Sequence, residues 1–408
     1  MTSPLWICCQ LGAREHYSVP RALQLRNQLG LLVTDVWSGG ATESGLFGAR
    51  ARGRFHPELR SAEVNAWTWG YRANEFFVRL RRNNWDRILA RNDWFQSRAL
   101  SAMKAFRDKH PERSVVLFAY SYAALRMVAF ARKAGWFTVL GQIDGGLGEH
   151  RLIGDIQRGI RGYENDWTAG PDRYWDEWKE ECALADRIVV NSDWSRRCLT
   201  SVGVQPDKLV TIPLAYEPPP AAQSFRRKIP VGFGPDRPFR VLFLGQVTVR
   251  KGVTAIFDSL DALKGEPVEF RMVGPVTIGL SEALRNHPQI RWVGPVPRSE
   301  VAREYQQADV LIFPTFSDGF GITQLEAQAW KLPIIASKNC GEVVRHLENG
   351  YVLPMVSPVD IAAAIRWIMA EPDRLGTMSR NSGVGSEFAL NHLAESLCDL
   401  AASKRQPA

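Results

Sequence analysis

The chain has 408 residues, of which 45% are hydrophobic and 23% are charged, and it carries a net charge of +8. This length suits two domains, and the composition excludes a disordered or fibrous protein. The positive charge indicates anionic partners, but no recognition module for nucleic acid accompanies it, so no nucleic-acid partner is expected.

Short apolar runs alternate with helical patterns in the first half of the chain. The runs that predict strands are LWICCQL, LGLLVTDV, SVVLFAY, WFTVLGQI and DRIVVNS, which begin at residues 5, 29, 114, 136 and 186. Residues 65–110 are rich in Trp and Arg, and we expect a helical insert there rather than strands. Alternating strands and helices predict a parallel sheet with helices on both faces.

The cysteines and the N-terminal sequence bear on the cellular compartment. Six cysteines are scattered without the spacing of metal ligands, and Cys8 and Cys9 lie in an apolar run, as small buried residues do. No charged region precedes the first apolar stretch, as a signal peptide requires, and no apolar run reaches the 18 or so residues of a membrane span. We therefore expect a reduced, cytoplasmic protein.

Pro and Gly are dense in residues 216–238, which we predict to be a linker. Beyond it the strand-like runs FRVLFLGQV, VEFRMVG, IRWVGPV, DVLIFPT and PIIAS alternate with helical patterns. These helices start near Lys251, Ser299, Ile322 and Ser357, and the last of them has a Ser-Pro-Val-Asp capping sequence.

The predicted fold is therefore α/β, with two Rossmann-like, doubly wound domains that face each other across a cleft. The first domain is expected at residues 1–215 and the second at 239–385. Residues 386–408 form a last helix and a tail, and the sequence leaves open on which domain this helix packs.

A glycine turn between two acids follows the strand-like run at 309–315. In DGFGITQLE, Asp318 precedes the turn and Glu326 lies just over one turn into the next helix. Ligands of parallel α/β sheets bind at the carboxyl ends of the strands, and a helix N-terminus after a glycine turn favours phosphate. The remaining candidates for ligand contact here are Gly319, Phe320, Gly321, Ile322 and Thr323. An ordinary glycine turn with two solvated acids is the alternative.

Two further loops carry the same kind of pattern. In GQVTVRKGV, Gly245 ends a strand and is followed by Gln246, and Arg250 and Lys251 open the next helix. Two cations at a helix N-terminus are unfavourable unless an anion lies there, so they predict a diphosphate site, with solvated surface charge as the alternative. A third loop, around Val296 and Pro297, has free backbone groups that suit the edge of a flat ring.

These motifs, read in order with ADVLIFPTFSDGFGITQLEA, resemble the donor domain of the retaining family 4 glycosyltransferases, also called glycosyl transferases group 1. The segment ALADRIVVNSDWSRRCLT resembles the last strand and helix of that family's first domain, and the match covers roughly residues 183–370. The resemblance implies the two-domain GT-B fold. It also implies a nucleoside-diphosphate sugar as co-substrate, with no other cofactor, and a carbohydrate or lipid-linked acceptor.

The family's acidic pair, Glu-x7-Glu, stands here as Asp318-x7-Glu326. The resemblance implies that Glu326 holds the ribose, that Asp318 faces the donor sugar, and that the amides at 320–322 contact sugar hydroxyls or phosphate. It assigns the diphosphate clamp to Arg250 and Lys251, while Gln246 replaces the arginine that many relatives have after the strand-ending glycine.

The acceptor side departs further from the family pattern. The glycine-rich loop of relatives is reduced to Gly12, and in the segment QIDGG Asp144 is kept whereas Ile143 replaces the usual histidine. His16 and His150 are the candidates to replace that histidine, although a lone surface histidine is more often structural.

The resemblance implies transfer of a sugar to an acceptor hydroxyl with retention of configuration, in polysaccharide or glycoconjugate synthesis. No Asp-x-Asp motif occurs, so a metal of that type is not expected, and Asp318, Arg250, Lys251 and Asp144 are the candidate catalytic residues. A nucleotide-sugar epimerase, a phosphorylase, or a sugar-nucleotide-binding protein without catalysis are the alternatives.

Residues 76–95 combine aromatic side chains with arginines. The aromatic residues are Phe76, Phe77, Trp85, Trp94 and Phe95, and the arginines are Arg79, Arg81, Arg82, Arg87 and Arg91. Such a helix suits peripheral contact with the inner face of an anionic membrane. The alternative is an ordinary amphipathic helix packed on the first domain.

Overall fold

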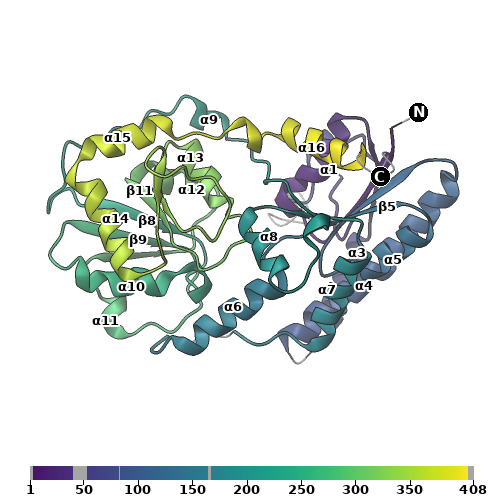
Figure 1. Ribbon diagram of the computed structural model, residues 1–408, viewed down its shortest axis with the longest axis horizontal. Coiled ribbons are helices and arrows are strands. Elements are labelled where there is room, and N and C mark those ends of the chain that lie inside the picture. The colour runs from purple at the N-terminus through teal and green to yellow at the C-terminus, as the bar shows by residue number, and fades with distance from the viewer. Residues whose placement is uncertain (1–2, 40–52, 82, 164–166, 403–408) are drawn as a thin grey trace.

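Two lobes lie side by side in the computed structural model, each built around a parallel β-sheet (Figure 1). The structure describes residues 3–39, 53–81, 83–163 and 167–402. Within these ranges no helix has both the length and the apolar character that a membrane span requires.

The N-terminal sheet has the strand order β3-β2-β1-β4-β5-β6-β7, and every neighbouring pair is parallel. Its strands are β1 (Leu5–Gln10), β2 (Leu29–Thr34), β3 (Val64–Ala66), β4 (Val115–Tyr120), β5 (Phe137–Gly141), β6 (Arg187–Val190) and β7 (Leu209–Thr211). The accompanying helices are α1 (Ser18–Leu25), α3 (Thr68–Arg79), α4 (Asn84–Lys109), α5 (Leu125–Lys133), α6 (Gly146–Gly159), α7 (Asp172–Leu184) and α8 (Asp193–Thr200).

The C-terminal sheet has the order β10-β9-β8-β11-β12-β13 and is also parallel. Its strands are β8 (Phe239–Leu244), β9 (Val268–Val273), β10 (Ile290–Gly294), β11 (Val310–Phe313), β12 (Ile334–Ala336) and β13 (Gly350–Val352). The helices of this half are α9 (Pro220–Gln223), α10 (Val253–Ala262), α11 (Glu282–Arg285), α12 (Val301–Gln307), α13 (Thr323–Ala329), α14 (Pro358–Ala370), α15 (Pro372–Asn381) and α16 (Leu390–Ala402).

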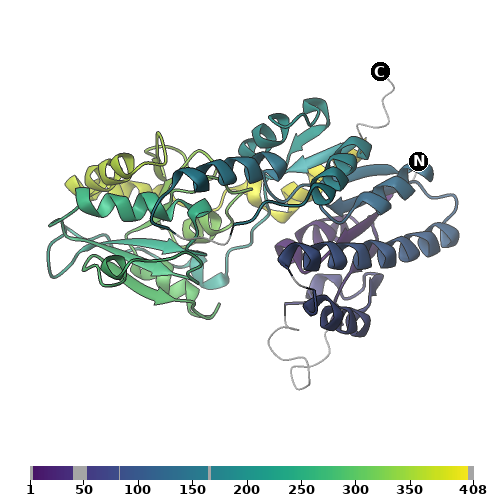
Figure 2. The ribbon, with the colours of Figure 1, turned by 90° about the horizontal axis from the view of Figure 1, so that it is seen from below.

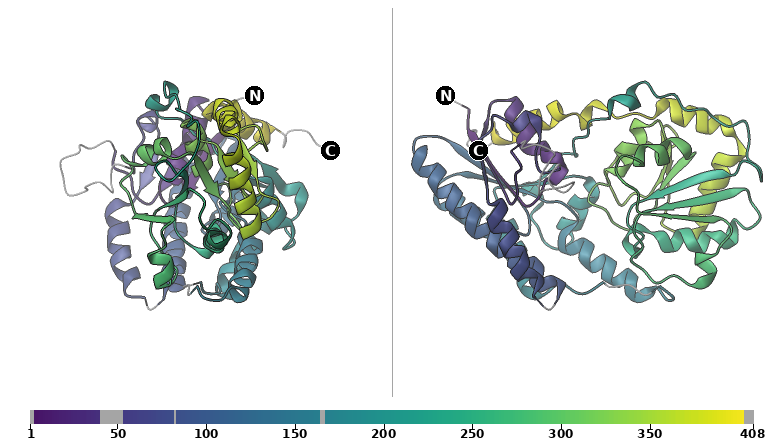
Figure 3. Two further views of the ribbon diagram at one scale, coloured as in Figure 1. Left: turned by 90° about the vertical axis from the view of Figure 1, so that its left-hand side faces the viewer. Right: turned by 180° about the vertical axis from the view of Figure 1, so that it is seen from behind.

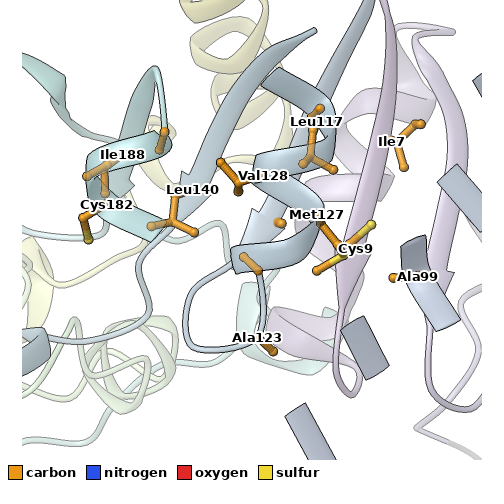
Figure 4. Packing of buried hydrophobic residues seen from close by; sticks show 14 of the residues in the cluster. Ile7, Cys9, Ala99, Leu117, Ala123, Met127, Val128, Leu140, Cys182 and Ile188 are labelled. Carbon is orange, nitrogen blue, oxygen red and sulfur yellow. The ribbon is translucent and has the colours of Figure 1, made fainter. Parts of the chain in front are cut away.

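The strands of the N-terminal sheet are buried on both faces, as a parallel sheet requires. Along β1, Ile7 and Cys9 point into the core layer under α4 and α5, whereas Trp6 and Cys8 point into the opposite layer, with α1. Figure 4 shows part of the first layer. Both cysteines are buried free thiols, as the apolar run predicted.

The last helix returns to the N-terminal domain and settles the question that the sequence left open. Leu390, Leu393 and Leu397 of α16 are buried in the same layer as Trp6, and Arg26 at the end of α1 bonds to Glu395 at 2.8 Å. Figure 3 shows α16 beside α1 on the N-terminal domain, away from the C-terminal sheet that precedes it in the sequence. Residues 403–408, the end of the segment expected to form the last helix and tail, lie outside the described residues.

The segment at 65–110 differs from the expected insert. It contains the short strand β3 and then α3 and α4, and α4 buries Phe95, Ala99 and Met103 against the sheet. Because α4 supplies one side of the main core, this segment is the crossover from β3 to β4 and an integral part of the domain.

The segment expected as a linker packs on the C-terminal domain. Ala222 is buried in one of its core layers, and the Arg227 guanidinium donates hydrogen bonds to Tyr305 O (2.7 Å) and Trp330 O (2.9 Å). Residues from about 222 onward therefore belong physically to the second half.

Most expected strands are present within a residue or two of their predicted bounds. Among the strands of the described residues, three were not predicted, β3, β7 and β13, each only three residues long. So short a strand leaves little periodicity to detect in the sequence, and its pairing depends on the neighbouring strand.

Candidate active site

The residues singled out in the C-terminal half gather at the carboxyl end of its sheet. Gly245 follows β8, Val296 and Pro297 follow β10, and Asp318 follows β11. Neighbouring parallel strands end at the same edge, so three loops that are distant in sequence form one site. Gln246 and Pro297 are exposed there.

Lys251 and Asp318 form an ion pair in this site. The Lys251 ammonium donates a hydrogen bond to Asp318 Oδ2 and lies 4.9 Å from the centroid of the Phe313 ring. Burial by itself would raise the pKa of Asp318, but the Lys251 and Arg250 cations outweigh burial and hold that pKa below its ordinary value. The structure thus joins the expected sugar-facing acid to an expected phosphate-binding cation.

Arg250 lies between carboxylates of the two domains. Its Nη1 donates to Ser317 O (2.9 Å) and lies 3.8 Å from both Asp318 Oδ2 and Glu149 Oε1. Glu149 belongs to the first turn of α6 in the N-terminal domain and accepts a hydrogen bond of 2.7 Å from Ser317 Oγ. An anionic ligand at this point would compete with Glu149 for the same guanidinium.

Glu149 is one of the site residues that sequence reasoning missed. Burial, reinforced by the negative charge of Asp144, raises the pKa of Glu149 to about 7, although Arg250 and the Ser317 hydroxyl oppose the shift. Its side chain is only 13% exposed. The available signal was an acid in the first turn of the helix after β5, but an acid that only stabilises a helix start has the same pattern.

Asp144 is oriented by donors from its own domain. The Tyr122 hydroxyl, Gln142 Nε2 (2.9 Å) and the backbone N–H of Gly146 (3.0 Å) all donate to Asp144 Oδ1. Gln142 is itself fixed, because its Oε1 accepts a hydrogen bond from Trp178 Nε1 (2.9 Å). Ile143, at the position of the family's histidine, packs against the core layer that contains α1.

The two domains touch at Gly319. The hydroxyls of Ser192 and Ser195 donate to Gly319 O at 2.6 and 3.1 Å, across the domain boundary. A Cβ on Gly319 would lie 2.4 Å from Ile143 O and 2.9 Å from Asp144 Cα. Close approach of two backbones therefore requires glycine here. It brings Asp318 and Asp144 to the same stretch of the domain boundary, which we call the domain seam.

The rest of the glycine turn is shaped by packing. Gly321 has φ +80°, and a Cβ there would lie 2.5 Å from the Phe313 ring. The Phe320 side chain is buried against Phe388, with ring centroids 5.9 Å apart. Ile322 immediately precedes α13 and Thr323 begins it, so both lie where the turn enters the helix.

Glu326 lies in the first turn of α13 and is half-buried. Tyr305 of α12 donates its hydroxyl to Glu326 Oε2 at 2.7 Å. Burial, followed by the Glu326 charge, raises the pKa of Tyr305 well above its ordinary value, so the hydroxyl keeps its proton and remains a donor. Tyr305 positions Glu326 and was not predicted.

On the acceptor side, His16 lies against the loop that follows β10. The distance between His16 Nε2 and Arg298 Nη2 is 2.7 Å, across the two domains. His16 takes the left-handed conformation (φ 52°), as do both of its neighbours, and Gly12 has φ +80°. The Gly12 amide donates to Asp35 Oδ1 at 3.0 Å, which holds the loop after β1 against the end of β2.

His150 has a different environment from His16. Its Nε2 accepts a hydrogen bond from the Gly170 amide at 3.1 Å, and its ring packs on Trp167 and Trp175 with centroids 5.0 and 4.8 Å away. This nitrogen is already used and the ring sits among aromatic side chains, so the structure gives His150 a packing role. Burial lowers the pKa of His150, and the charge of the nearby Asp144 opposes this shift.

Among the residues that the structure describes, no group of three or more His, Cys, Asp or Glu side chains is arranged to hold a metal ion.

Comparison with known proteins gives this geometry a context. Residues 225–383 match the family model of glycosyl transferases group 1. Among the relatives, the D-inositol 3-phosphate glycosyltransferase of Kineococcus radiotolerans is 27% identical over 226 residues, covering 48% of this chain and 51% of the relative. That of Geodermatophilus obscurus is 28% identical over 222 residues, 48% of each chain. The chain therefore aligns with about half the length of these relatives.

Solved structures match over nearly the whole chain. Anabaena HepE in complex with UDP has a TM-score of 0.61 at 13% identity, covering 98% of this chain and all of that one. Sucrose-phosphate synthase from Thermosynechococcus elongatus has a TM-score of 0.64 at 15% identity, with 99% of each chain covered. At such identities the likeness shows the fold, and the fold is the two-domain GT-B architecture. The chain therefore resembles glycosyl transferases group 1 over residues 225–383 and has a GT-B fold over nearly its whole length.

Proposed function

We propose that this protein is a glycosyltransferase that moves a sugar from a nucleoside diphosphate to an acceptor hydroxyl. The observation that carries the proposal is the pairing of Lys251 and Arg250 with Asp318, at the sheet edge where the two domains meet next to Asp144. Relatives named D-inositol 3-phosphate glycosyltransferases and the complexes of HepE with UDP and with UDP-glucose support the same class of donor and acceptor.

Each residue at the donor side has a role in this proposal. Glu326, oriented by Tyr305, accepts hydrogen bonds from the ribose hydroxyls, and the loop at Val296 and Pro297 borders the base. Lys251 and Arg250 bind the diphosphate, and their ion pairs with Asp318 hold both cations beside the acid that faces the sugar. Asp318 then faces the sugar hydroxyls.

The reaction breaks the bond between the anomeric carbon and the diphosphate oxygen and forms one to the acceptor oxygen. The leaving diphosphate gains negative charge in the transition state, and two fixed cations stabilise that charge most where water is excluded. We propose attack on the same face as departure, with the acceptor proton passing to the leaving phosphate, which retains the configuration. This step needs no cofactor besides the nucleotide sugar.

We propose that the acceptor enters at the carboxyl edge of the N-terminal sheet, beside Asp144 and His16. The acceptor is a carbohydrate or a lipid-linked carbohydrate, and the product belongs to polysaccharide or glycoconjugate synthesis. A lipid-linked acceptor would require peripheral contact with the inner face of a membrane.

A thermal-shift series against UDP, GDP, ADP and their sugar conjugates tests the donor site. A ligand at 100 times its dissociation constant stabilises the folded state by about 2.7 kcal/mol. We expect a shift with one nucleotide, lost in Glu326→Ala and kept in Glu282→Ala, which removes an exposed acid from the same domain. No shift with any nucleotide would contradict the donor site.

Turnover separates the alternatives once a donor is known. Release of nucleoside diphosphate that depends on an added acceptor supports transfer. A changed sugar without an acceptor would indicate an epimerase, formation of a sugar phosphate from inorganic phosphate would indicate a phosphorylase, and binding without turnover across acceptors would indicate a non-catalytic protein.

A further inference from the structure

Helix α3 presents an apolar stripe to solvent. Trp69, Phe76, Phe77 and Leu80 are 67%, 65%, 64% and 70% exposed. Among the described residues, every exposed Trp and Phe lies on this helix. Phe76, Phe77 and Leu80 lie seven, eight and eleven positions after Trp69. This spacing places all four side chains on one face of a helix, as in a face that contacts an apolar surface.

The opposite face of α3 is already packed. Trp67 and Tyr71 contact Trp94 of α4, with ring centroids 6.4 and 5.7 Å apart, and Val78 is buried. The inner face therefore packs the helix on its own domain, whereas the side chains of the outer stripe are mostly exposed. In Figure 2, α3 projects beyond the long helix α4 on the lower side of the N-terminal domain.

The charges on this helix and directly after it are positive where they face solvent. Arg72, Arg79 and Arg81 are exposed, and the Arg72 guanidinium lies 5.3 Å from the centroid of the Trp69 ring. The acid of α3, Glu75, is paired with Arg91 of α4 through two hydrogen bonds of 2.6 and 2.9 Å. The outer face thus combines aromatic side chains with arginines.

The placement of α3 relates this face to the acceptor side. The helix begins directly after β3, at the carboxyl edge of the N-terminal sheet, and the Thr68 hydroxyl donates to Trp37 O at 3.2 Å in the loop after β2. This is the edge from which Asp144 and His16 extend, so a surface that covers α3 lies beside the proposed acceptor entrance.

We propose that the outer face of α3, defined by Trp69, Arg72, Phe76, Phe77 and Leu80, docks on the surface of an anionic lipid bilayer. Aromatic and aliphatic side chains enter the interface between head groups and acyl chains, and the arginines bind the anionic head groups. Twelve residues span about 18 Å, too short to cross a bilayer but suited to lie in its surface.

A second copy of the chain fits this face less well. A two-fold axis brings the same surface of both copies together, so the arginines of both copies would enter one interface. A strip about 18 Å long and 10 Å wide also covers only about 180 Å², well below the roughly 800 Å² per partner of a stable interface.

The sequence predicted membrane contact for residues 76–95. The structure restricts the candidate residues to the outer face of α3. Phe95 is buried and Trp94 packs on α3, while Trp85 donates its indole N–H to Thr168 at 3.0 Å. These three side chains belong to packing within the domain. Arg82 lies outside the described residues.

Co-sedimentation of the full chain with vesicles tests the docking face without any donor present. We expect binding to vesicles of phosphatidylcholine with 30% phosphatidylglycerol, weaker binding to phosphatidylcholine alone, and at least a tenfold loss in Phe76→Ser/Phe77→Ser. Replacing Arg72, Arg79 and Arg81 by Gln should also weaken vesicle binding at least tenfold, since each arginine near an anionic surface strengthens binding about fivefold. The control Met355→Ser/Val359→Ser removes equally exposed apolar side chains, 68% and 75%, from the other domain and should bind like wild type.

No sedimentation of the wild-type chain, or equal binding by the Phe76/Phe77 variant, overturns the proposal. A wild-type dimer in analytical ultracentrifugation that the Phe76/Phe77 variant abolishes also overturns it, in favour of a second copy. The inference rests on the proposed function only for the nature of the acceptor: nucleotide thermal shifts report on the donor site, and vesicle binding reports on α3. The two can therefore fail separately.

Discussion

Replacing Glu149 by Gln should remove a pH dependence from the stability of the protein. The Glu149 carboxyl is buried between the domains, and its pKa is raised from 4.5 to about 7, chiefly by burial. A raised pKa in the folded state means that this state binds the proton more tightly than the unfolded chain does. The stabilisation is therefore complete below pH 4.5 and is lost as the pH rises through 7.

The magnitude follows from these two pKa values. Linkage gives a contribution from Glu149 of about 2 kcal/mol at pH 5.5 and about zero at pH 8.5. Gln cannot ionise, keeps an oxygen that can accept the hydrogen bond from Ser317, and so resembles the protonated form at every pH. Between pH 5.5 and 8.5 the wild-type protein should lose about 2 kcal/mol more free energy of unfolding than Glu149→Gln does.

Urea unfolding at pH 5.5, 7.0 and 8.5 measures this difference. The buried Glu181, whose pKa burial also raises to about 7, is present in both proteins, so its effect cancels. Glu180→Gln alters an exposed acid and should follow the wild-type curve. Parallel curves for wild type and Glu149→Gln would refute the reasoning. A wild-type protein that gains stability with rising pH, relative to the variant, would mean that Arg250 holds Glu149 as a carboxylate.

Three further substitutions test the backbone and the buried groups, each by urea unfolding or steady-state kinetics. Glu181→Ala should cost about 3 kcal/mol or more, because its carboxylate accepts the backbone N–H groups of residues 122, 124 and 125 at 2.6–3.0 Å, and Glu180→Ala should cost under about 0.5 kcal/mol. Gly252→Ala should destabilise by more than about 1 kcal/mol, since φ is +71° and the new Cβ would lie 1.8 Å from Pro314 O; an unchanged midpoint would contradict this. Gly319→Ala should separate the loop after β11 from Asp144 and lower kcat/KM by about tenfold or more for the donor identified by thermal shift, and full activity would show that the seam is not needed.

Local patterns in the sequence predicted most of the strands and helices and the donor-side residues of the candidate site. Apolar runs with strand length, broken by capping sequences such as that at Ser357, predicted the alternation of strands and helices, and Ser357 does cap α14 by accepting a hydrogen bond from the Asp360 amide. Asp318, Lys251 and Glu326 could be selected because glycine turns after strands point to a ligand edge. Their roles remain predictions, while their gathering at one sheet edge is a property of the structure.

The contacts between distant segments could not be predicted in the same way. Glu149 meets Ser317 across 168 positions of the chain, and no local spacing records that meeting. His16 and His150 have similar sequence surroundings in that each is a lone histidine near a strand end, yet only His16 reaches the opposite domain. Helix α16 could pack on either domain by its pattern alone, and the tertiary fold returned it to α1.

Helix α3 illustrates why some features can be predicted from the sequence and others depend on tertiary packing. Its sequence has apolar residues on two faces, and periodicity cannot say which face is covered. The packing of Trp67 and Tyr71 on Trp94 decides that Trp69, Phe76 and Phe77 face solvent. The sequence by itself determined the α/β alternation, the acidic pair and the cationic pair, because these depend on neighbours along the chain. The tertiary structure alone decided the domain seam, the environment of Glu149 and the exposed stripe, because these depend on which surfaces become buried against each other.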